Sequence, residues 1–242
     1  MGNLRNNLIK YILIALILLS CVIFVIKFAG PNLLIQYISY GIGDCKKIPI
    51  LCMEPEEKII RPEGRLENYL QELVPQKFPH MAILCPKGFT IVQELIKRPY
   101  YKKNKWLDKG GIIYLLRQEP GEFLKLYPDV KKQGVNNNYE FIERLSSANL
   151  NKVKNITDAF FVIMKSVFTP DIGSQKIVKM IKFQTYQFRG FINYNLSWPN
   201  NYFDCNIMDS RDNFYKVYIQ DRGNRLDLNK VFAIISTIKP AG

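Results

Sequence analysis

The sequence is poor in histidine, since His80 is the only one among 242 residues. A serine or cysteine nucleophile usually needs a histidine base beside it, and His80 lies in a proline-flanked connector. No serine stands in a G-x-S-x-G motif. Zinc sites need several cysteine or histidine ligands, and the chain has no C-x2-C pair. The sequence therefore predicts no metal site and gives no support to triad chemistry.

Glycine-rich motifs that bind phosphates or dinucleotides are also absent. Carboxylates crowd the C-terminal third at Asp204, Asp209, Asp212 and Asp221. Most of them fall in predicted turns, where aspartate is common for conformational reasons. We therefore expect no cofactor and no catalytic residue, and we interpret the chain as a non-enzyme.

One long hydrophobic run is present near the N-terminus, at residues 8–30, LIKYILIALILLSCVIFVIKFAG. About 20 apolar residues in a helix cross a bilayer core. Three interpretations compete: an uncleaved signal anchor, a cleaved secretory signal, and a lipoprotein signal in which Cys21 is lipidated. No A-x-A cleavage site follows the run, and the chain stays apolar after Cys21. We favour a transmembrane signal anchor and keep lipidation of Cys21 as the alternative.

The charges beside this run predict its orientation. Arg5, Lys10 and the amino terminus precede it, and no acidic residue occurs before Asp44. The positive-inside rule then predicts a single-pass membrane protein with a cytoplasmic N-terminus and a periplasmic, lumenal or cell-surface domain. Such a compartment permits disulfides, and Cys45 and Cys52, spaced C-x6-C, are the expected pair.

The pattern divides the chain into an N-terminal membrane anchor (1–30), a proline-rich connector with a short helix (31–80), and an extracytoplasmic α+β domain (81–242). Alternating apolar and polar residues predict strands in the domain, and a 3.6-residue period predicts helices. The predicted fold class is α+β, with an antiparallel meander and helices packed on one face. The expected elements are a helix at 66–73; strands at 81–85, 89–96 and 112–117; a helix capped by Asn138 and another at 157–168; meander strands at 176–185, 187–196, 203–207 and 215–219; and a last helix capped by Asp227.

The domain begins with the apolar entry PKGF at residues 86–89, has a central helical insertion, and ends in a four-strand meander followed by a helix. This order of elements resembles that of the PsbP-type family, which includes extrinsic photosystem proteins. The resemblance covers residues 81–240 and involves no specific motif. It implies a PsbP-like fold and no functional residue.

Basic residues outnumber acidic ones, 34 to 21, for a net charge of +13 at pH 7. The densest basic segment is KRPYYKKNKWLDK at residues 97–109, where aromatic residues alternate with lysines. Such segments suit anionic partners. Outside the cytoplasm we expect an acidic protein face or anionic lipid rather than nucleic acid. The candidate anion-binding residues are Lys97, Arg98, Lys102, Lys103, Lys105, Trp106 and Lys109.

Two functions fit these features best. The first is a membrane-anchored, non-catalytic accessory or assembly subunit that presents a basic α+β domain to a protein partner. The second is a membrane-tethered binding module for an anionic ligand or polymer, and an enzyme without a recognisable motif comes third. A pocket lined by converging charged groups would favour the second or third, and a flat apolar patch the first.

Overall fold

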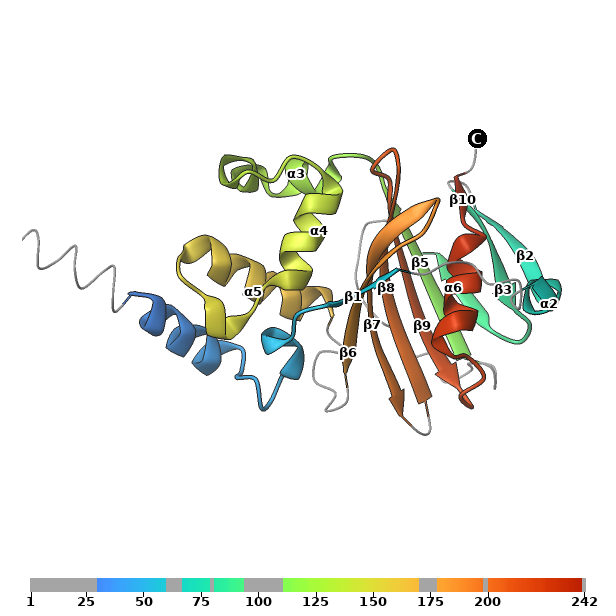
Figure 1. Ribbon diagram of the computed structural model, residues 1–242, viewed down its shortest axis with the longest axis horizontal. Coiled ribbons are helices and arrows are strands. Elements are labelled where there is room, and N and C mark those ends of the chain that lie inside the picture. Colours follow the sequence, from blue (N-terminus) through green and yellow to red (C-terminus); the bar gives the residue numbers. More distant parts are fainter. Residues whose placement is uncertain are drawn as a thin grey trace, which may run out of the picture.

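A computed structural model describes residues 30–59, 67–78, 81–93, 111–169, 178–197 and 200–240. Its elements surround one large sheet, with residues 30–41 forming the first described helix (Figure 1). In chain order, the other elements are η1 (Pro49–Cys52), β1 (Glu56–Ile59), α2 (Glu67–Gln71), β2 (Leu73–Phe78), β3 (Met81–Pro86), β4 (Thr90–Gln93), β5 (Gly111–Gln118), α3 (Glu122–Leu126), η3 (Pro128–Gln133), α4 (Asn138–Ser147), η4 (Leu150–Lys152), α5 (Ile156–Phe168), β6 (Lys179–Gln184), β7 (Phe188–Ser197), β8 (Asn200–Asp209), β9 (Phe214–Arg222), α6 (Leu228–Ser236) and β10 (Lys239–Pro240).

The large sheet has seven strands in the order β1-β6-β7-β8-β9-β5-β4. The predicted meander is its centre, since β6 to β9 pair antiparallel with their neighbours in sequence. The predicted fold class is nevertheless wrong, because the sheet is larger and mixed. β1 pairs parallel with β6 at one edge, and β4 pairs parallel with β5 at the other. Parallel pairs join segments that are distant in sequence, and local alternation does not reveal them.

One face of the large sheet packs against α6, which lies between it and a second sheet of three strands, β10-β3-β2 (Figure 1). Five consecutive α6 residues, Val231 to Ile235, are buried. The polar residues Asn229 and Ser236 of α6 stay exposed, while its wide apolar surface is covered by the two sheets. The side chains of Phe203, Cys205 and Ile207 in β8 complete this core.

The opposite face packs against α3, α4 and α5, so the predicted one-sided packing is also wrong. Aromatic rings dominate this second core: the Phe123 ring stacks on Phe141 with centroids 4.8 Å apart and meets Phe214 edge-on at 5.0 Å. Strand alternation explains why both faces are apolar. Phe191 in β7 and Met208 in β8 point away from the α6 side and join this helical layer.

The predicted transmembrane helix is corrected as well. Among the described residues, no helix is long and apolar enough to cross a membrane. The predicted span, residues 8–30, lies outside the described residues except for Gly30. The helix at 30–41 instead packs on α5, where Ile38 contacts Ala159 and Val162 in a small apolar cluster.

Candidate functional site

The predicted anion-binding segment, residues 97–109, lies outside the described residues, as does Cys21. The predicted cysteine pair lies within them. Cys45 and Cys52 form a disulfide with their Cα atoms 5.7 Å apart. The candidate site therefore consists of described residues, beginning with those around this disulfide.

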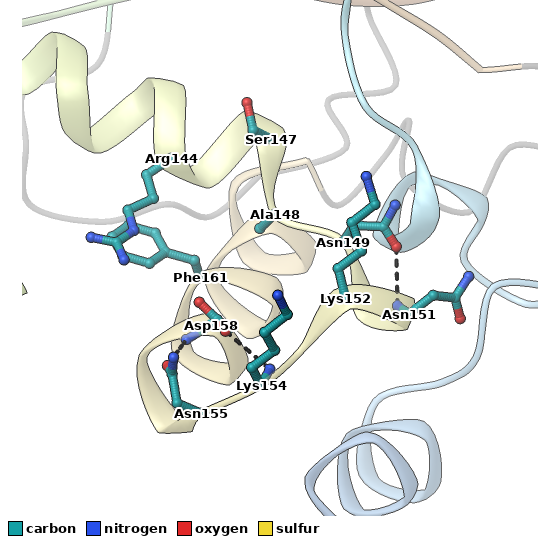
Figure 2. Close-up of a pocket in the computed structure, with 10 residues that line it drawn as sticks. All are labelled: Arg144, Ser147, Ala148, Asn149, Asn151, Lys152, Lys154, Asn155, Asp158 and Phe161. Carbon is teal, nitrogen blue, oxygen red and sulfur yellow. Dashed lines mark hydrogen bonds between the residues drawn. The ribbon is translucent and has the colours of Figure 1, made fainter. Parts of the chain in front are cut away.

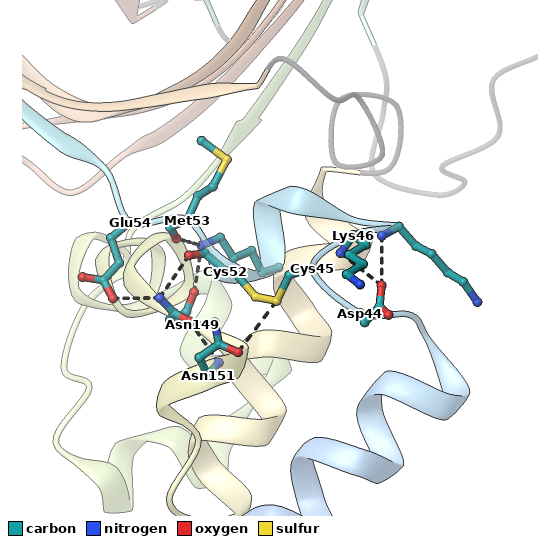
Figure 3. Close-up of a disulfide and its surroundings, with 11 residues drawn as sticks. Asp44, Cys45, Lys46, Cys52, Met53, Glu54, Asn149 and Asn151 are labelled. Carbon is teal, nitrogen blue, oxygen red and sulfur yellow. Dashed lines mark hydrogen bonds between the residues drawn. A yellow bond between two sulfur atoms is a disulfide. The ribbon is translucent and has the colours of Figure 1, made fainter.

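The disulfide closes the loop before β1 on itself, and this loop lies beside the region of η4 (Figure 3). Asp44 shapes the loop, because its Oδ1 accepts hydrogen bonds of 3.0 Å from the backbone N–H groups of residues 46–47. Asn149 lies across from it. Its Nδ2 donates to the carbonyl oxygen of Cys52 at 3.1 Å and to Oε1 of Glu54 at 3.0 Å. The hydrogen bonds of Asn149 thus join this disulfide-closed loop to a segment about 100 residues later in the chain.

A buried lysine of α5 also binds both the disulfide loop and the segment after α4, and we call the meeting point of these segments the junction. Lys165 in α5 is 1% exposed, and its Nζ donates to the carbonyl oxygens of Met53 at 2.7 Å, Ser146 at 2.7 Å and Ala148 at 2.8 Å. Burial lowers the pKa of Lys165 to about 7. The three carbonyls oppose that shift, because an ammonium group satisfies all three acceptors. Lys165 therefore ties the disulfide loop and the end of α4 to α5.

An open cleft of ≈ 600 Å³ lies beside this junction, where α4 leads through η4 into α5. Figure 2 labels all ten lining residues, with Arg144 and Phe161 on one side and Asn149, Asn151 and Lys152 on the other. We call it the basic cleft. Its lining includes Arg144, Asn149, Asn155, Lys152, Lys154 and Asp158.

The three cations of the basic cleft differ in how they are held. Lys154 is exposed, and its ammonium group has no partner among the described residues. Lys152 pairs with Glu54 at 2.5 Å, at the rim near the disulfide. Arg144 donates to a backbone carbonyl at 2.6 Å, and its guanidinium carbon lies 5.4 Å from the Phe161 ring centroid. Counting partners among the described residues alone, the cleft contains one free cation and two positioned ones.

The carboxylate in the lining, Asp158, is used to begin α5. Its Oδ2 accepts the backbone N–H of Lys154 at 3.0 Å, while Oδ1 of Asn155 accepts the backbone N–H of Asp158 at 2.9 Å. This pair is a variant of the capping box, in which the side chain at N3 bonds to the residue before the N-cap Asn155. The remaining lining offers cations and side-chain amides, which are hydrogen-bond donors. The geometry therefore suits the holding of an anion.

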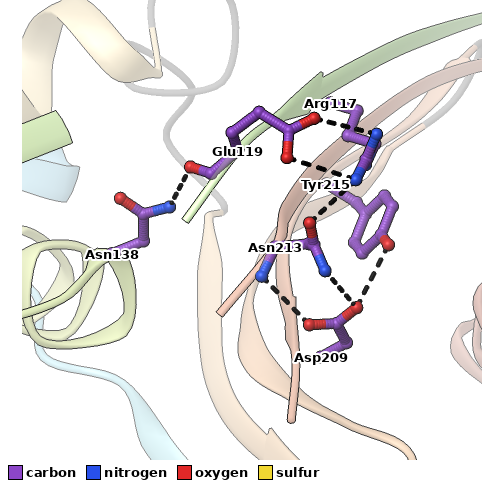
Figure 4. Close-up of polar contacts among 6 residues, drawn as sticks. All are labelled: Arg117, Glu119, Asn138, Asp209, Asn213 and Tyr215. Carbon is purple, nitrogen blue, oxygen red and sulfur yellow. Dashed lines mark hydrogen bonds and ion pairs between the residues drawn. The ribbon is translucent and has the colours of Figure 1, made fainter. Parts of the chain in front are cut away.

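Two of the clustered aspartates, Asp209 and Asp212, have structural roles, and Figure 4 shows the contacts of Asp209. Asp209 accepts the backbone N–H of Asn213 at 3.0 Å and the hydroxyl of Tyr215 at 3.2 Å, which closes the β8–β9 turn. Asp212 accepts the backbone N–H of Asn138 at 2.7 Å and that of the next residue at 3.0 Å. It therefore caps α4 from a turn far along the chain. Neither carboxylate faces the basic cleft lining.

The two other described cysteines are buried and free. Burial raises the pKa of the Cys85 thiol to about 12 and holds that of Cys205 well above its usual range. Thiolate is the nucleophilic form, so these thiols are poor nucleophiles at neutral pH. In the part of the chain that the structure describes, no group of three or more histidine, cysteine, aspartate or glutamate side chains could hold a metal ion.

Sequence reasoning missed the basic cleft, although a signal for it exists. Residues 149–155, NLNKVKN, contain three asparagines and two lysines between two predicted helices. The prediction of an anion-binding segment was instead made for the longer basic segment at residues 97–109. The contributions of Arg144 and of the disulfide loop depend on helix packing, and no spacing in the sequence indicates them.

Comparisons with known protein families and with curated proteins gave no match to this chain. The PsbP-like resemblance therefore stays a prediction, and the function must be argued from the geometry of the site.

Proposed function

We propose that this chain is a non-catalytic binding protein that holds an acidic segment of a partner protein in the basic cleft. The observation that carries the proposal is the pairing of charges in the cleft. The ammonium group of Lys154 has no partner among the described residues, whereas the carboxylate of Asp158 accepts a backbone hydrogen bond. A carboxylate from a partner could therefore pair with the ammonium group of Lys154, because the carboxylate of Asp158 is already hydrogen-bonded to the backbone.

A peptide segment fits this cleft better than a bare anion for two reasons. The cleft is open to solvent, so an extended chain can enter it. Side-chain amides of Asn151 and Asn155 stand in the same lining and can hydrogen-bond to a peptide backbone. The net charge of +13 adds long-range attraction for an acidic partner. These features support an accessory or assembly role.

The disulfide between Cys45 and Cys52 supports an oxidising compartment for this domain. It also stabilises the wall of the cleft, because Asn149 and Lys152 contact the loop that the disulfide closes. In such a compartment a protein is the expected partner, and nucleic acid is not. We therefore expect binding in the basic cleft to depend on the intact disulfide.

The test is a titration of a fluorescein-labelled hexaglutamate peptide with the full-length protein, followed by fluorescence anisotropy. Reversing the free cation with Lys154→Glu should raise the Kd at least about fivefold, since an exposed attraction becomes a repulsion. The matched control is Lys77→Glu, which makes the same charge change on β2, away from the basic cleft. Its Kd should stay within about twofold of the wild-type value.

Two further results complete the experiment. Binding should weaken as salt is raised, because the contacts are charged and exposed. Equal weakening by both variants would mean that only net charge matters, and it would overturn the assignment of the basic cleft. The absence of any hexaglutamate binding at low salt would overturn the proposed function itself.

A further inference from the structure

A second cleft, of ≈ 500 Å³, lies on the α6 side of the large sheet. Four parts of the chain meet there: α2, the β3–β4 turn, the segment between β9 and α6, and α6 itself. We call it the aromatic cleft. Its lining includes Tyr69, Leu73, Lys87, Phe89, Arg225 and Lys230.

Two cations of the aromatic cleft are held against aromatic rings. The guanidinium carbon of Arg225 lies 4.6 Å from the Phe89 ring centroid, and Nζ of Lys230 lies 5.4 Å from that of Tyr69. Lys230 also donates to the carbonyl oxygen of Arg225 at 2.9 Å. These contacts position both cations before any ligand arrives, which lowers the entropy that binding must overcome. Lys87 adds a third, exposed cation.

The wall of the cleft also contains an unused hydroxyl group. The Tyr69 oxygen is buried and has no hydrogen-bond partner in the part of the chain that the structure describes. Burial raises the pKa of the Tyr69 hydroxyl, so it stays protonated and can donate at neutral pH. Buried polar groups are almost always hydrogen-bonded, and an orphan group beside a cleft points to a missing acceptor.

Within the lining, cations outnumber acids, since Glu72 faces three cations. Asp227 lies outside the lining at the start of α6, where its Oδ1 accepts the backbone N–H of Lys230 at 2.8 Å. Asp221 lies behind the wall, fully buried, and its Oδ2 accepts the backbone N–H of Leu226 at 2.7 Å. Its Oδ1 lies 3.8 Å from Nε of Arg225 and so helps to position that cation. The cleft therefore combines an apolar wall with a surplus of donors.

We propose that the aromatic cleft binds a small organic anion that has an apolar body, such as an aromatic carboxylate or sulfonate. The apolar body would lie against Leu73 and Phe89. The anionic group would face Lys87 and Lys230, with the Tyr69 hydroxyl as an uncharged donor. This proposal concerns a different surface from the basic cleft and does not rest on the function proposed there.

The test is isothermal titration calorimetry of the full-length protein with 2-naphthalenesulfonate. The double variant Lys87→Gln/Lys230→Gln should raise the Kd at least about tenfold, since charge-assisted contacts are lost. The control Lys131→Gln/Lys179→Gln removes the same charge at two exposed lysines that line neither cleft and should change the Kd by less than about twofold. Methanesulfonate, which lacks the apolar body, should bind at least about tenfold more weakly than 2-naphthalenesulfonate.

Tyr69→Phe removes one oxygen atom and should raise the Kd about threefold or more. This variant carries the test if thermal melting shows that the double variant is unfolded. Equal effects of the two double variants, or an unchanged Kd in Tyr69→Phe, would overturn the proposed cleft. Equal affinity for methanesulfonate would overturn the apolar part of the ligand.

Discussion

The ammonium group of Lys165 donates a hydrogen bond of 2.7 Å to the carbonyl oxygen of Met53, 112 residues earlier in the chain. The same group binds the carbonyls of Ser146 and Ala148 at the end of α4. A helix C-terminus carries partial negative charge, so the cation is well placed there. One side chain thus joins the disulfide loop, α4 and α5, the three segments that shape the basic cleft.

Replacing Lys165 by methionine should destabilise the protein by at least about 2 kcal/mol, because three buried or half-buried carbonyls lose their donor. The loss of a costly buried charge offsets part of this effect. Lys154→Met is the matched control on an exposed lysine and should change the free energy of unfolding by less than about 0.5 kcal/mol. Urea denaturation measures both. Equal stabilities for the two variants would contradict the structural role of Lys165.

The pKa of Lys165 predicts a pH dependence of stability. It is about 7 in the folded protein, below its ordinary value of 10.5. Between these values the unfolded chain binds more protons than the folded one, so the free energy of unfolding rises with pH. The free energy of unfolding of the wild type minus that of Lys165→Met should therefore increase between about pH 7 and 10. The slope should be at most about 1.4 kcal/mol per pH unit. A difference that falls with pH in this window would contradict the lowered pKa.

Reduction of the disulfide should lower the free energy of unfolding by about 2–3 kcal/mol, as expected for a cross-link that closes a short loop. The double variant Cys45→Ser/Cys52→Ser should show the same loss and no further response to dithiothreitol. Alkylation followed by peptide mass mapping provides the second measurement. In freshly isolated, unreduced protein, Cys45 and Cys52 should resist iodoacetamide. Modification of both without reduction would contradict the disulfide.

Asp212 should matter for α4 although it lies in the β8–β9 turn. Its carboxylate accepts two backbone N–H groups at the start of α4, and its backbone has φ 63°, which asparagine tolerates better than alanine. Asp212→Ala should cost about 2–3 kcal/mol through the lost cap and the strained turn. Asp212→Asn keeps the turn and one acceptor, so it should cost about 1 kcal/mol. Thermal denaturation followed by circular dichroism would reveal the order, and identical losses would contradict this assignment.

The sequence alone determined the central strands and the last helix. Alternation in β7, β8 and β9 fixes which side chains face each core, because a strand side chain changes face at every residue. Asp227 caps α6 as predicted, since its side chain accepts the backbone N–H of Lys230 at 2.8 Å. These are local features, which short-range patterns report well. The cap of α4 shows the limit: Asn137 rather than Asn138 accepts the capping bond.

Tertiary structure decided the rest. The edge strands β1 and β4 pair in parallel with β6 and β5. Parallel partners are not adjacent in sequence, so no local period encodes these pairings. Burial of the apolar surface of α6 depends on a second sheet, in which β2 and β3 pair with each other and the distant strand β10 pairs with β3. The basic cleft arises in the same way. Lys152 and Lys154 are neighbours in sequence, but Arg144 and the disulfide loop reach them only through helix packing. The sequence shows these basic residues, but only the packing of the helices brings them together in one cleft.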